Sequence, residues 1–279
     1  MTASASSATT ALGAAPVVGL RFRPTGRIYY YQPGALALKT AQGAFRHWTK
    51  GEDRSPVSDA DIAVNDLLHQ RLTALAPGAG WLSEETEGSA DTTHALIWIV
   101  DPIDGTRAFI SGRADWSIST ALVEDGRPLV AALYAPVSEE IFLAVRGAGA
   151  TLNGAPIKAN DGDGLRGAKI AGPKRYLDRF SNLAEGTLAQ PKVHSLALRL
   201  ARVAQGALDA AFSSRGSHDW DLAAADLLVH EAGGALTDFT GRPLKYNGSQ
   251  AVHGALIAAG QARHDALIGL VRDRKAEFA

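Results

Sequence analysis

Apolar residues recur at a spacing near 3.6 between residues 58 and 76, and this period predicts an amphipathic helix. Ser58 stands at its start and Asp61 follows three residues later, the pattern of a capping box. Similar patterns predict helices over residues 35–48, 195–204, 221–232 and 262–271. Pro33-Gly34 is expected to break the chain before the first of these, and residues 50–56 are expected to form a polar loop.

Shorter apolar runs predict strands. The run over residues 96–100 is continuous and ends abruptly at Asp101, as in a fully buried strand. Residues 117–124 and 129–134 flank Asp125-Gly126 and predict a hairpin, so the first half of the chain is expected to hold an antiparallel sheet. Further strands are expected over residues 141–145, 169–171, 208–212, 235–238 and 255–258.

Two segments interrupt this pattern and indicate the domain organisation. The stretch over residues 160–167 is polar and rich in glycine, which favours a linker between two halves. The first twenty residues are uncharged and rich in Ala, Ser and Thr, without the basic region that opens a secretory signal. We therefore expect an atypical N-terminal segment over residues 1–33, one half over residues 34–160 and a second over residues 161–279.

Composition excludes several classes of protein. The 279 residues carry 28 basic and 29 acidic side chains, a net charge of -1, which disfavours binding to a nucleic-acid polymer. No apolar stretch approaches the roughly 18 residues of a membrane span. The absence of cysteine excludes a disulfide framework, a thiol nucleophile and Cys-ligated metal sites, and it fits a reducing, cytoplasmic compartment. Any metal must therefore have oxygen or histidine ligands.

The segment over residues 98–106 carries the clearest chemistry. The buried strand ends at Asp101, Pro102 is expected to end its hydrogen-bond ladder, and Asp104 follows across a tight turn. Gly105-Thr106 can open a helix whose free N–H groups face the same point. Two carboxylates beside such N–H groups form a place where hard cations and a phosphate can meet. Taken alone, Asp-Pro-x-Asp is equally compatible with a structural turn.

The longer string DPIDGT at residues 101–106 resembles the inositol monophosphatase superfamily, which comprises lithium-sensitive, magnesium-dependent phosphomonoesterases. Three other segments resemble that family in the same order: SPVSDAD at 55–61, LSEE at 82–85, and WDLAAAD at 220–226 followed by EAGG at 231–234. The resemblance extends from Gly34 to the C-terminus. It implies an α/β (α+β) fold, a layered α/β/α/β/α sandwich, with most metal ligands in the first half and the second half completing the active site.

The resemblance also implies a role for each matching residue. The first Mg²⁺ is expected to bind Glu84, Asp101 and the backbone carbonyl of Ile103, and the second to bind Asp101, Asp104 and Asp221. Glu84 can reach a third ion through water, and Mn²⁺ can substitute for Mg²⁺. The expected phosphate-binding residues are Gly105 and Thr106, and the expected catalytic residues are Asp61, Thr106 and Glu84, with Asp61 and Thr106 orienting the attacking water.

Structural alternatives stay open for several of these residues when each is considered alone. Glu84-Glu85 is compatible with a solvated pair on a loop, Asp61 with a capping residue, and Asp221 with an N-cap. Asp226 is expected on a helix surface, and Asp115 at a turn before a strand. The eight histidines show no metal-binding spacing and are expected to be surface or core side chains.

The substrate is less clearly indicated. Inositol-specific members resemble one another in a Glu seven residues before the aspartate of the Trp-Asp pair, where this chain has Ser214, and in a Gly-Thr pair, where it has His194-Ser195. Basic residues at Lys174, Arg175, Arg199 and Arg215 could pair with a second phosphate. The expected substrate-binding residues are Gly105, Thr106, Lys174, Arg175, Ser195, Arg199 and Asp221.

These features favour the branch of 3'(2'),5'-bisphosphate nucleotidases. Inositol-1-monophosphatase and histidinol-phosphatase are the alternatives within the family, and a non-catalytic regulatory binding protein on the same scaffold is an alternative of another class. A sugar kinase or synthase-type α/β enzyme is disfavoured, because the chain has neither G-x-x-x-x-G-K-[ST] nor a strand followed by G-x-G-x-x-G. The resemblance further implies a small phosphorylated substrate and a homodimer.

Overall fold

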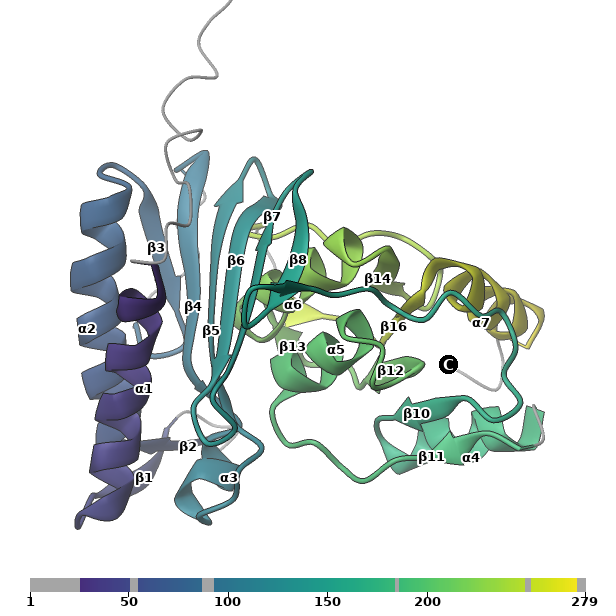
Figure 1. The fold of residues 1–279 in the computed structure, drawn as a ribbon, viewed down its shortest axis with the longest axis horizontal. Helices are drawn as coiled ribbons and strands as arrows, with labels where there is room; N and C mark the ends of the chain where they lie inside the picture. Colours follow the sequence, from purple (N-terminus) through teal and green to yellow (C-terminus); the bar gives the residue numbers. More distant parts are fainter. Residues whose placement is uncertain (1–25, 51–54, 87–92, 184–185, 249–251, 275–279) are drawn as a thin grey trace, which may run out of the picture.

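Two sheets, joined by residues 157–168, organise the chain (Figure 1). The computed structural model describes residues 26–50, 55–86, 93–183, 186–248 and 252–274. The segment before residue 26, where we expect poor packing, lies outside the described residues. No helix within these ranges is both long and apolar enough to cross a lipid bilayer.

The first sheet has seven strands in sequence order, and all pairs except β3–β4 are antiparallel. Its strands β3 to β9 are Gly80–Ser83, Leu96–Asp104, Ser117–Glu124, Arg127–Ala135, Glu140–Val145, Gly149–Leu152 and Ala155–Pro156. Asp125 and Gly126 have positive φ in the predicted hairpin between β5 and β6. The predicted antiparallel sheet is therefore confirmed, with one parallel strand added at its edge.

Helices cover both faces of this sheet. Helices α1 (Gly26–Gln42) and α2 (Asp59–Leu75) lie on one face, and α5 (Leu196–Ala204) and α6 (Asp219–Glu231) lie on the other (Figure 1). Trp98 and Val100 of β4 pack with α2, whereas Ile97 and Ile99 pack with α5 and α6. Because neighbouring residues of a strand point to opposite faces, a strand covered on both sides is apolar throughout.

The second sheet has five strands in the order β11-β10-β12-β16-β14. Their bounds in that order are Leu188–Ala189, Lys169–Ala171, Ala210–Ser213, Leu256–Gly260 and Gly234–Asp238. A two-stranded pair, β13 (Ser217–His218) and β15 (Val252–His253), lies beside it. Helices α4 (Lys174–Leu183) and α7 (Gln261–Asp273) cover its outer face, and α5 and α6 lie between the two sheets (Figure 1). The fold is thus the expected α/β/α/β/α sandwich.

The N-terminal helix differs from its prediction. Helix α1 starts at Gly26 and ends at Gln42, with Pro33 inside it. A Cβ on Gly34 would lie 2.3 Å from the Tyr134 ring, so the lack of a side chain lets the helix approach the sheet closely. Packing therefore overrides the breaking tendency of Pro33-Gly34.

Residues after this helix also differ from their prediction. His47–Lys50 form strand β1, which pairs with β2 (Ser55–Ser58), where a helix end and a polar loop are expected. The pairing places Trp48 opposite Val57, and Trp48 remains 43% exposed. The strand reflects the β propensity of the Trp-Thr pair, Trp48 and Thr49, together with a partner strand that the local pattern does not reveal.

Candidate active site

An irregularity in β4 brings Asp101 and Asp104 together. Asp101 lies opposite Ser119 and Asp104 opposite Ser117, so three steps along β4 match two steps along β5. The extra residue is a β-bulge, and it offsets the alternation that would send residues three apart to opposite faces. The ladder therefore continues through Pro102, contrary to the prediction that it ends there, and both buried carboxylates reach the same point.

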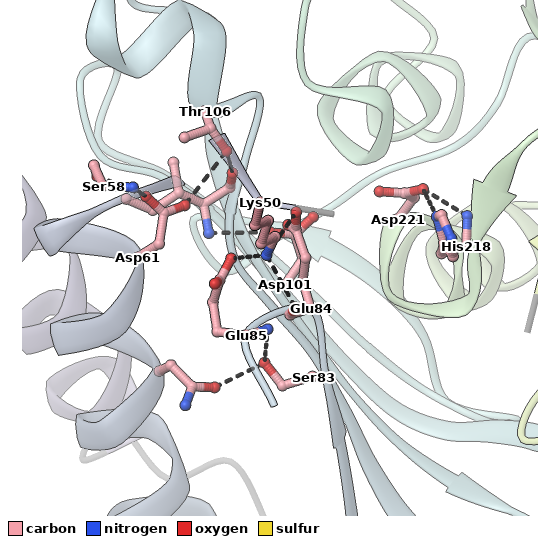
Figure 2. Close-up of polar contacts among 12 residues, drawn as sticks. Lys50, Ser58, Asp61, Ser83, Glu84, Glu85, Asp101, Thr106, His218 and Asp221 are labelled. Carbon is pink, nitrogen blue, oxygen red and sulfur yellow. Dashed lines mark hydrogen bonds and ion pairs between the residues drawn. The ribbon is translucent and has the colours of Figure 1, made fainter. Parts of the chain in front are cut away.

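Asp221 joins this pair from the other half of the chain. One carboxylate oxygen from each of Asp101, Asp104 and Asp221 lies within 4.8 Å of the other two. Asp221 is the third residue of α6, and its Oδ2 accepts a hydrogen bond of 2.6 Å from the backbone N of His218 (Figure 2). The helix thus begins two residues before its predicted start, with His218 as N-cap and Asp221 as the capping-box acid.

Lys50 connects the two glutamates that follow β3. Its Nζ donates to the backbone oxygen of Glu84 at 3.0 Å, lies 3.3 Å from Oε1 of Glu84, and forms an ion pair with Glu85 (Figure 2). The Glu85 side chain is only 3% exposed and that of Glu84 17%. The glutamates are therefore not a solvated loop pair, since a single lysine from the β1–β2 hairpin holds both.

The concentration of carboxylates makes the site favourable for cations. Burial, followed by repulsion from neighbouring carboxylates, holds the pKa of Asp101 and of Asp221 well above the usual range. Burial also raises the pKa of Glu84 to about 7, although Lys50 opposes this rise. A bound cation would remove the repulsion and keep these groups ionised. The oxygen-only donor set fits Mg²⁺ or Mn²⁺ better than softer metals.

Asp61 and Thr106 form a second cluster, which Figure 2 shows together with Ser58. The hydroxyl of Thr106 lies within donating distance of Oδ1 of Asp61, at 3.3 Å, and of the backbone oxygen of Ile103, at 3.1 Å. The N and Oγ of Ser58 donate to Oδ2 of Asp61 at 2.8 and 2.6 Å, which confirms the predicted capping box. Burial raises the pKa of Asp61 to about 6 despite these bonds.

Gly105 occupies a position that disfavours any residue with a side chain. Its φ of 93° is in the left-handed region, and an added Cβ would lie 3.1 Å from the backbone N of Ser195. It caps helix α3 (Thr106–Ile110), the short helix predicted at this point. Gly105 therefore allows the β4 segment to approach the start of α5.

Asp104 holds the start of α5 directly. Its carboxylate accepts hydrogen bonds from Oγ of Ser195 at 2.6 Å, N of Leu196 at 3.2 Å and N of Ala197 at 2.7 Å. Ser195 is fully buried, and its hydroxyl also accepts from the backbone N of Leu198. The Ser195 side chain is thus turned into the protein and positions Asp104.

A basic cleft of about 670 Å³ opens next to Asp221. Its basic side chains are Lys174, Lys192, His194, Arg199 and Arg215. The Nε of Arg199 is buried and lacks a hydrogen-bond partner. Within the described part of the chain, neither Lys192 nor Arg215 forms an ion pair, whereas Lys174 pairs with Asp178. The cleft therefore presents uncompensated positive charge.

The comparisons with known proteins agree with this arrangement. The model of the inositol monophosphatase family matches residues 31–276. This chain belongs to the inositol monophosphatase family. Its curated relatives include phosphatases, and the chain is a phosphatase of this family.

Relatives within the inositol monophosphatase family carry different names. A Nus factor SuhB from Xylella fastidiosa is 36% identical over 193 residues, covering 66% of this chain and 69% of its own length. A histidinol-phosphatase from Mycobacterium tuberculosis is 36% identical over 217 residues, covering 74% and 82%. A 3'(2'),5'-bisphosphate nucleotidase CysQ from Aggregatibacter actinomycetemcomitans is 32% identical over 215 residues, covering 70% and 77%.

A solved structure shares the whole architecture. An IMPase from Thermotoga maritima superposes with a TM-score of 0.78 at 25% identity, covering 92% of this chain and 98% of its own. The inositol monophosphatase fold of this chain is therefore established, whereas its substrate is not fixed by these likenesses.

Of the four basic residues predicted to pair with a second phosphate, Lys174, Arg199 and Arg215 line the basic cleft, whereas Arg175 does not. Its guanidinium lies 4.6 Å from the centre of the Tyr176 ring and donates to the Tyr176 hydroxyl at 2.9 Å.

Lys192 lines the basic cleft and Lys50 pairs with Glu84 and Glu85, and neither lysine was predicted to belong to the site. Lys192 lies between β11 and α5, and Lys50 is the last residue of β1. Neither belongs to a motif, and their charge was the only signal that the sequence offered.

One further acid, Asp226, differs from its predicted position, and Asp115 makes contacts that were not predicted. Asp226 is 6% exposed, accepts a hydrogen bond from the Tyr246 hydroxyl at 2.9 Å and pairs with Nδ1 of His230 at 2.8 Å, because α6 is enclosed by both sheets. Asp115 does precede a strand, but its carboxylate also binds N and Nδ1 of His194, at 2.8 and 2.6 Å. Burial opposes ionisation of Asp115, yet the bonds from His194 and Arg113 lower its pKa to about 2.

Proposed function

We propose that this inositol monophosphatase family member hydrolyses a phosphate monoester that carries a second phosphate, with a nucleoside 3',5'-bisphosphate as the best candidate. The observation that carries the proposal is the basic cleft beside Asp221, in which Arg199 has an unpaired buried Nε. A second phosphate there would form charge-assisted hydrogen bonds with arginine and lysine. The phosphate that is removed would lie at the three aspartates.

The proposed metal ligands are those that the resemblance implies. Glu84, Asp101 and the Ile103 carbonyl would hold one Mg²⁺, and Asp101, Asp104 and Asp221 a second, while Glu84 could bind a third through water. The clustering of Asp101, Asp104 and Asp221 supports this assignment. When bound, Mg²⁺ or Mn²⁺ supplies neutralising charge for phosphate oxygens and the leaving alkoxide, and lowers the pKa of water.

Asp61 and Thr106 would position the attacking water. Their side chains meet at 3.3 Å, and the Asp61 pKa of about 6 suits a carboxylate that accepts a proton near neutral pH. Because Ser58 fixes Oδ2 of Asp61, Oδ1 stays directed toward Thr106. The backbone N–H groups of Gly105 and Thr106, at the start of α3, would bind oxygens of the phosphate.

The charge of the cleft distinguishes the candidate substrates. Histidinol phosphate carries an ammonium group that the basic side chains would repel, and inositol 1-phosphate has no second anion to pair with them. The CysQ relative is named for a bisphosphate substrate. The relative named as a histidinol-phosphatase makes that activity the main competing proposal. A purely regulatory role is disfavoured because the cluster of three aspartates is complete.

The deciding experiment measures Mg²⁺-dependent phosphate release. Substrates are adenosine 3',5'-bisphosphate, inositol 1-phosphate, histidinol phosphate and fructose 1,6-bisphosphate. We expect the nucleotide to give the highest kcat/KM, and Arg215→Gln to lower it about tenfold through loss of a charge-assisted bond. Arg175→Gln, adjacent to the cleft but turned away from it, is the matched control. A higher kcat/KM for histidinol phosphate would contradict the proposal.

Two properties beyond the reaction also remain proposals. We propose a homodimer, on the basis of the family resemblance, and a cytoplasmic location, which the absence of cysteine supports. Sedimentation equilibrium of the purified chain tests the first, and fractionation of its source cells tests the second.

A further inference from the structure

A second cleft opens on the other side of Asp221. Its volume is about 660 Å³, and it shares only Gly216 and Asp221 with the basic cleft. Its apolar wall consists of Trp48, Val57, Ile62, His218 and Trp220. We call it the aromatic cleft. The two clefts meet at the aspartate that the proposed function places beside the scissile phosphate.

The wall of the aromatic cleft includes aromatic surface that is exposed to solvent. The rings of His218 and Trp220 stack with their centres 4.5 Å apart and an angle of 4° between their planes. Across the cleft, Trp48 is 43% exposed and Ile62 is 37% exposed. Within the described ranges, Trp48 belongs to no buried cluster and contacts no other ring. An indole in this state gains contact area when a flat apolar ligand binds.

The charges of the two clefts indicate which part of a substrate each cleft can bind. The aromatic cleft contains Glu84 and Glu85, whose two carboxylates share the single positive charge of Lys50. A phosphate in the aromatic cleft would therefore meet carboxylates, whereas the basic cleft offers Lys192, Arg199 and Arg215. An uncharged planar group has the opposite preference, because stacking requires aromatic surface and no counter-charge.

We infer that the aromatic cleft binds a planar heterocyclic ring of the substrate, such as a nucleobase, and that Trp48 determines specificity for it. The inference rests on the proposed function and assigns a place to each part of that substrate. In a nucleoside 3',5'-bisphosphate, the base is attached at C1' of the ribose and the second phosphate at C5'. These two positions lie on either side of C3', which carries the 3'-phosphate. This connectivity matches two clefts that diverge from Asp221.

The test uses four substrates that differ in whether they carry a base and whether they carry a second phosphate. Adenosine 3',5'-bisphosphate has a base and a second phosphate, adenosine 3'-monophosphate only the base, fructose 1,6-bisphosphate only the second phosphate, and inositol 1-phosphate neither. The readout is the ratio of kcat/KM between substrates with and without a base. Calorimetry in EDTA with adenosine 5'-monophosphate and ribose 5-phosphate gives the corresponding ratio for binding alone, because the Mg²⁺-dependent reaction cannot proceed.

We expect Trp48→Leu to lower the base-dependent ratio by about fivefold to a hundredfold, the range of stacking on one aromatic side chain. Trp48→Phe should restore most of it, because a flat ring returns. Val137→Ala is the matched control, since Val137 is 45% exposed and lies outside both clefts. An unchanged ratio in Trp48→Leu would overturn the inference.

A second variant separates this inference from the proposed function. Arg215→Gln should lower the ratio for substrates with a second phosphate and leave the base-dependent ratio as it is. Loss of the base effect in Trp48→Leu without any phosphate effect in Arg215→Gln would retain the ring site and contradict the second phosphate. The reverse result would retain the proposed function and overturn the ring site.

Discussion

Asp61 and Asp221 occupy the same position in two helices and meet different surroundings. Each is the third residue of its helix, and each accepts a hydrogen bond from the backbone N of the N-cap residue, Ser58 or His218. Asp61 then faces the neutral hydroxyl of Thr106, whereas Asp221 lies within 4.8 Å of two other carboxylates. One local motif thus supplies carboxylates for two different tasks.

The comparison shows that the capping box orients each carboxylate. The element that faces the carboxylate, β4 or the start of α3, then determines which groups it meets. Both side chains are fixed before a ligand arrives, which lowers the cost of organising the site. The bulge of β4 brings two aspartates opposite α6, and the start of α3 brings a threonine opposite α2. We therefore propose that Asp61 accepts a proton and that Asp221 binds a cation.

The largest effect is expected for Asp221→Asn. Loss of a charge from the cation site should lower kcat by about a thousandfold and weaken Mg²⁺ binding. The same change removes repulsion among buried carboxylates, so the metal-free protein should melt no lower than the parent. Phosphate release, Mg²⁺ calorimetry and thermal melting in EDTA measure the three effects. Tight Mg²⁺ binding by the variant would contradict the assignment.

Asp61→Asn should act on kcat and spare the cation. Loss of a proton acceptor costs about a hundredfold, the low end for general bases, because Thr106 still holds the water. The amide oxygen can still accept from Ser58, so α2 keeps its cap. Mg²⁺ affinity measured by calorimetry should match that of the parent. A parallel loss of Mg²⁺ binding would place Asp61 among the metal ligands instead.

The pH dependence of stability should separate the metal-free from the metal-bound protein. The folded-state pKa is about 6 for Asp61 and about 7 for Glu84, against 3.8 and 4.5 as ordinary values. Between these limits the folded chain retains protons that the unfolded chain releases, so stability falls as pH rises. In EDTA, Tm should fall from about pH 4 to about pH 7. Saturating Mg²⁺ should remove the fall, and an equal fall in both buffers would contradict this.

The smallest effect on activity is expected for Asp226→Asn, a control on the same helix as Asp221. Its bonds to Tyr246 and His230 are structural, so the free energy of unfolding should fall by about 1–3 kcal/mol while kcat stays near that of the parent. Hydrogen bonding to Asp226 raises the pKa of His230 to about 9 against the effect of burial. The part of this destabilisation that is due to His230 should be complete below about pH 6.5 and disappear as pH rises through about 9.

The sequence predicted the parts of the site that lie in contiguous motifs. Asp101, Asp104, Thr106 and Asp221 follow or begin strong elements, and the structure brings them together from both halves. Lys192 and Lys50 were not predicted, because a solvated loop lysine and a lysine that points into a cleft look alike in sequence. Their roles depend on which segments lie opposite, a long-range property.

The predictions that failed also depend on which segments pack together over long range. Pro33 lies inside α1 because Gly34 packs against Tyr134, and Trp48 lies in a strand because β2 pairs with it. Asp226 was expected on a helix surface, since a charged residue of a helix usually faces solvent. Helix α6 has no free face, because it lies between the two sheets, and only the tertiary arrangement reveals this.

The bulge in β4 also determines which changes the family motif can tolerate. One extra residue between Asp101 and Asp104 brings their carboxylates to the same side of the strand. Substituting Pro102 or Ile103 keeps that count, whereas inserting or deleting one residue reverses the direction of one aspartate. The length of this segment is therefore constrained in addition to the identity of its two aspartates.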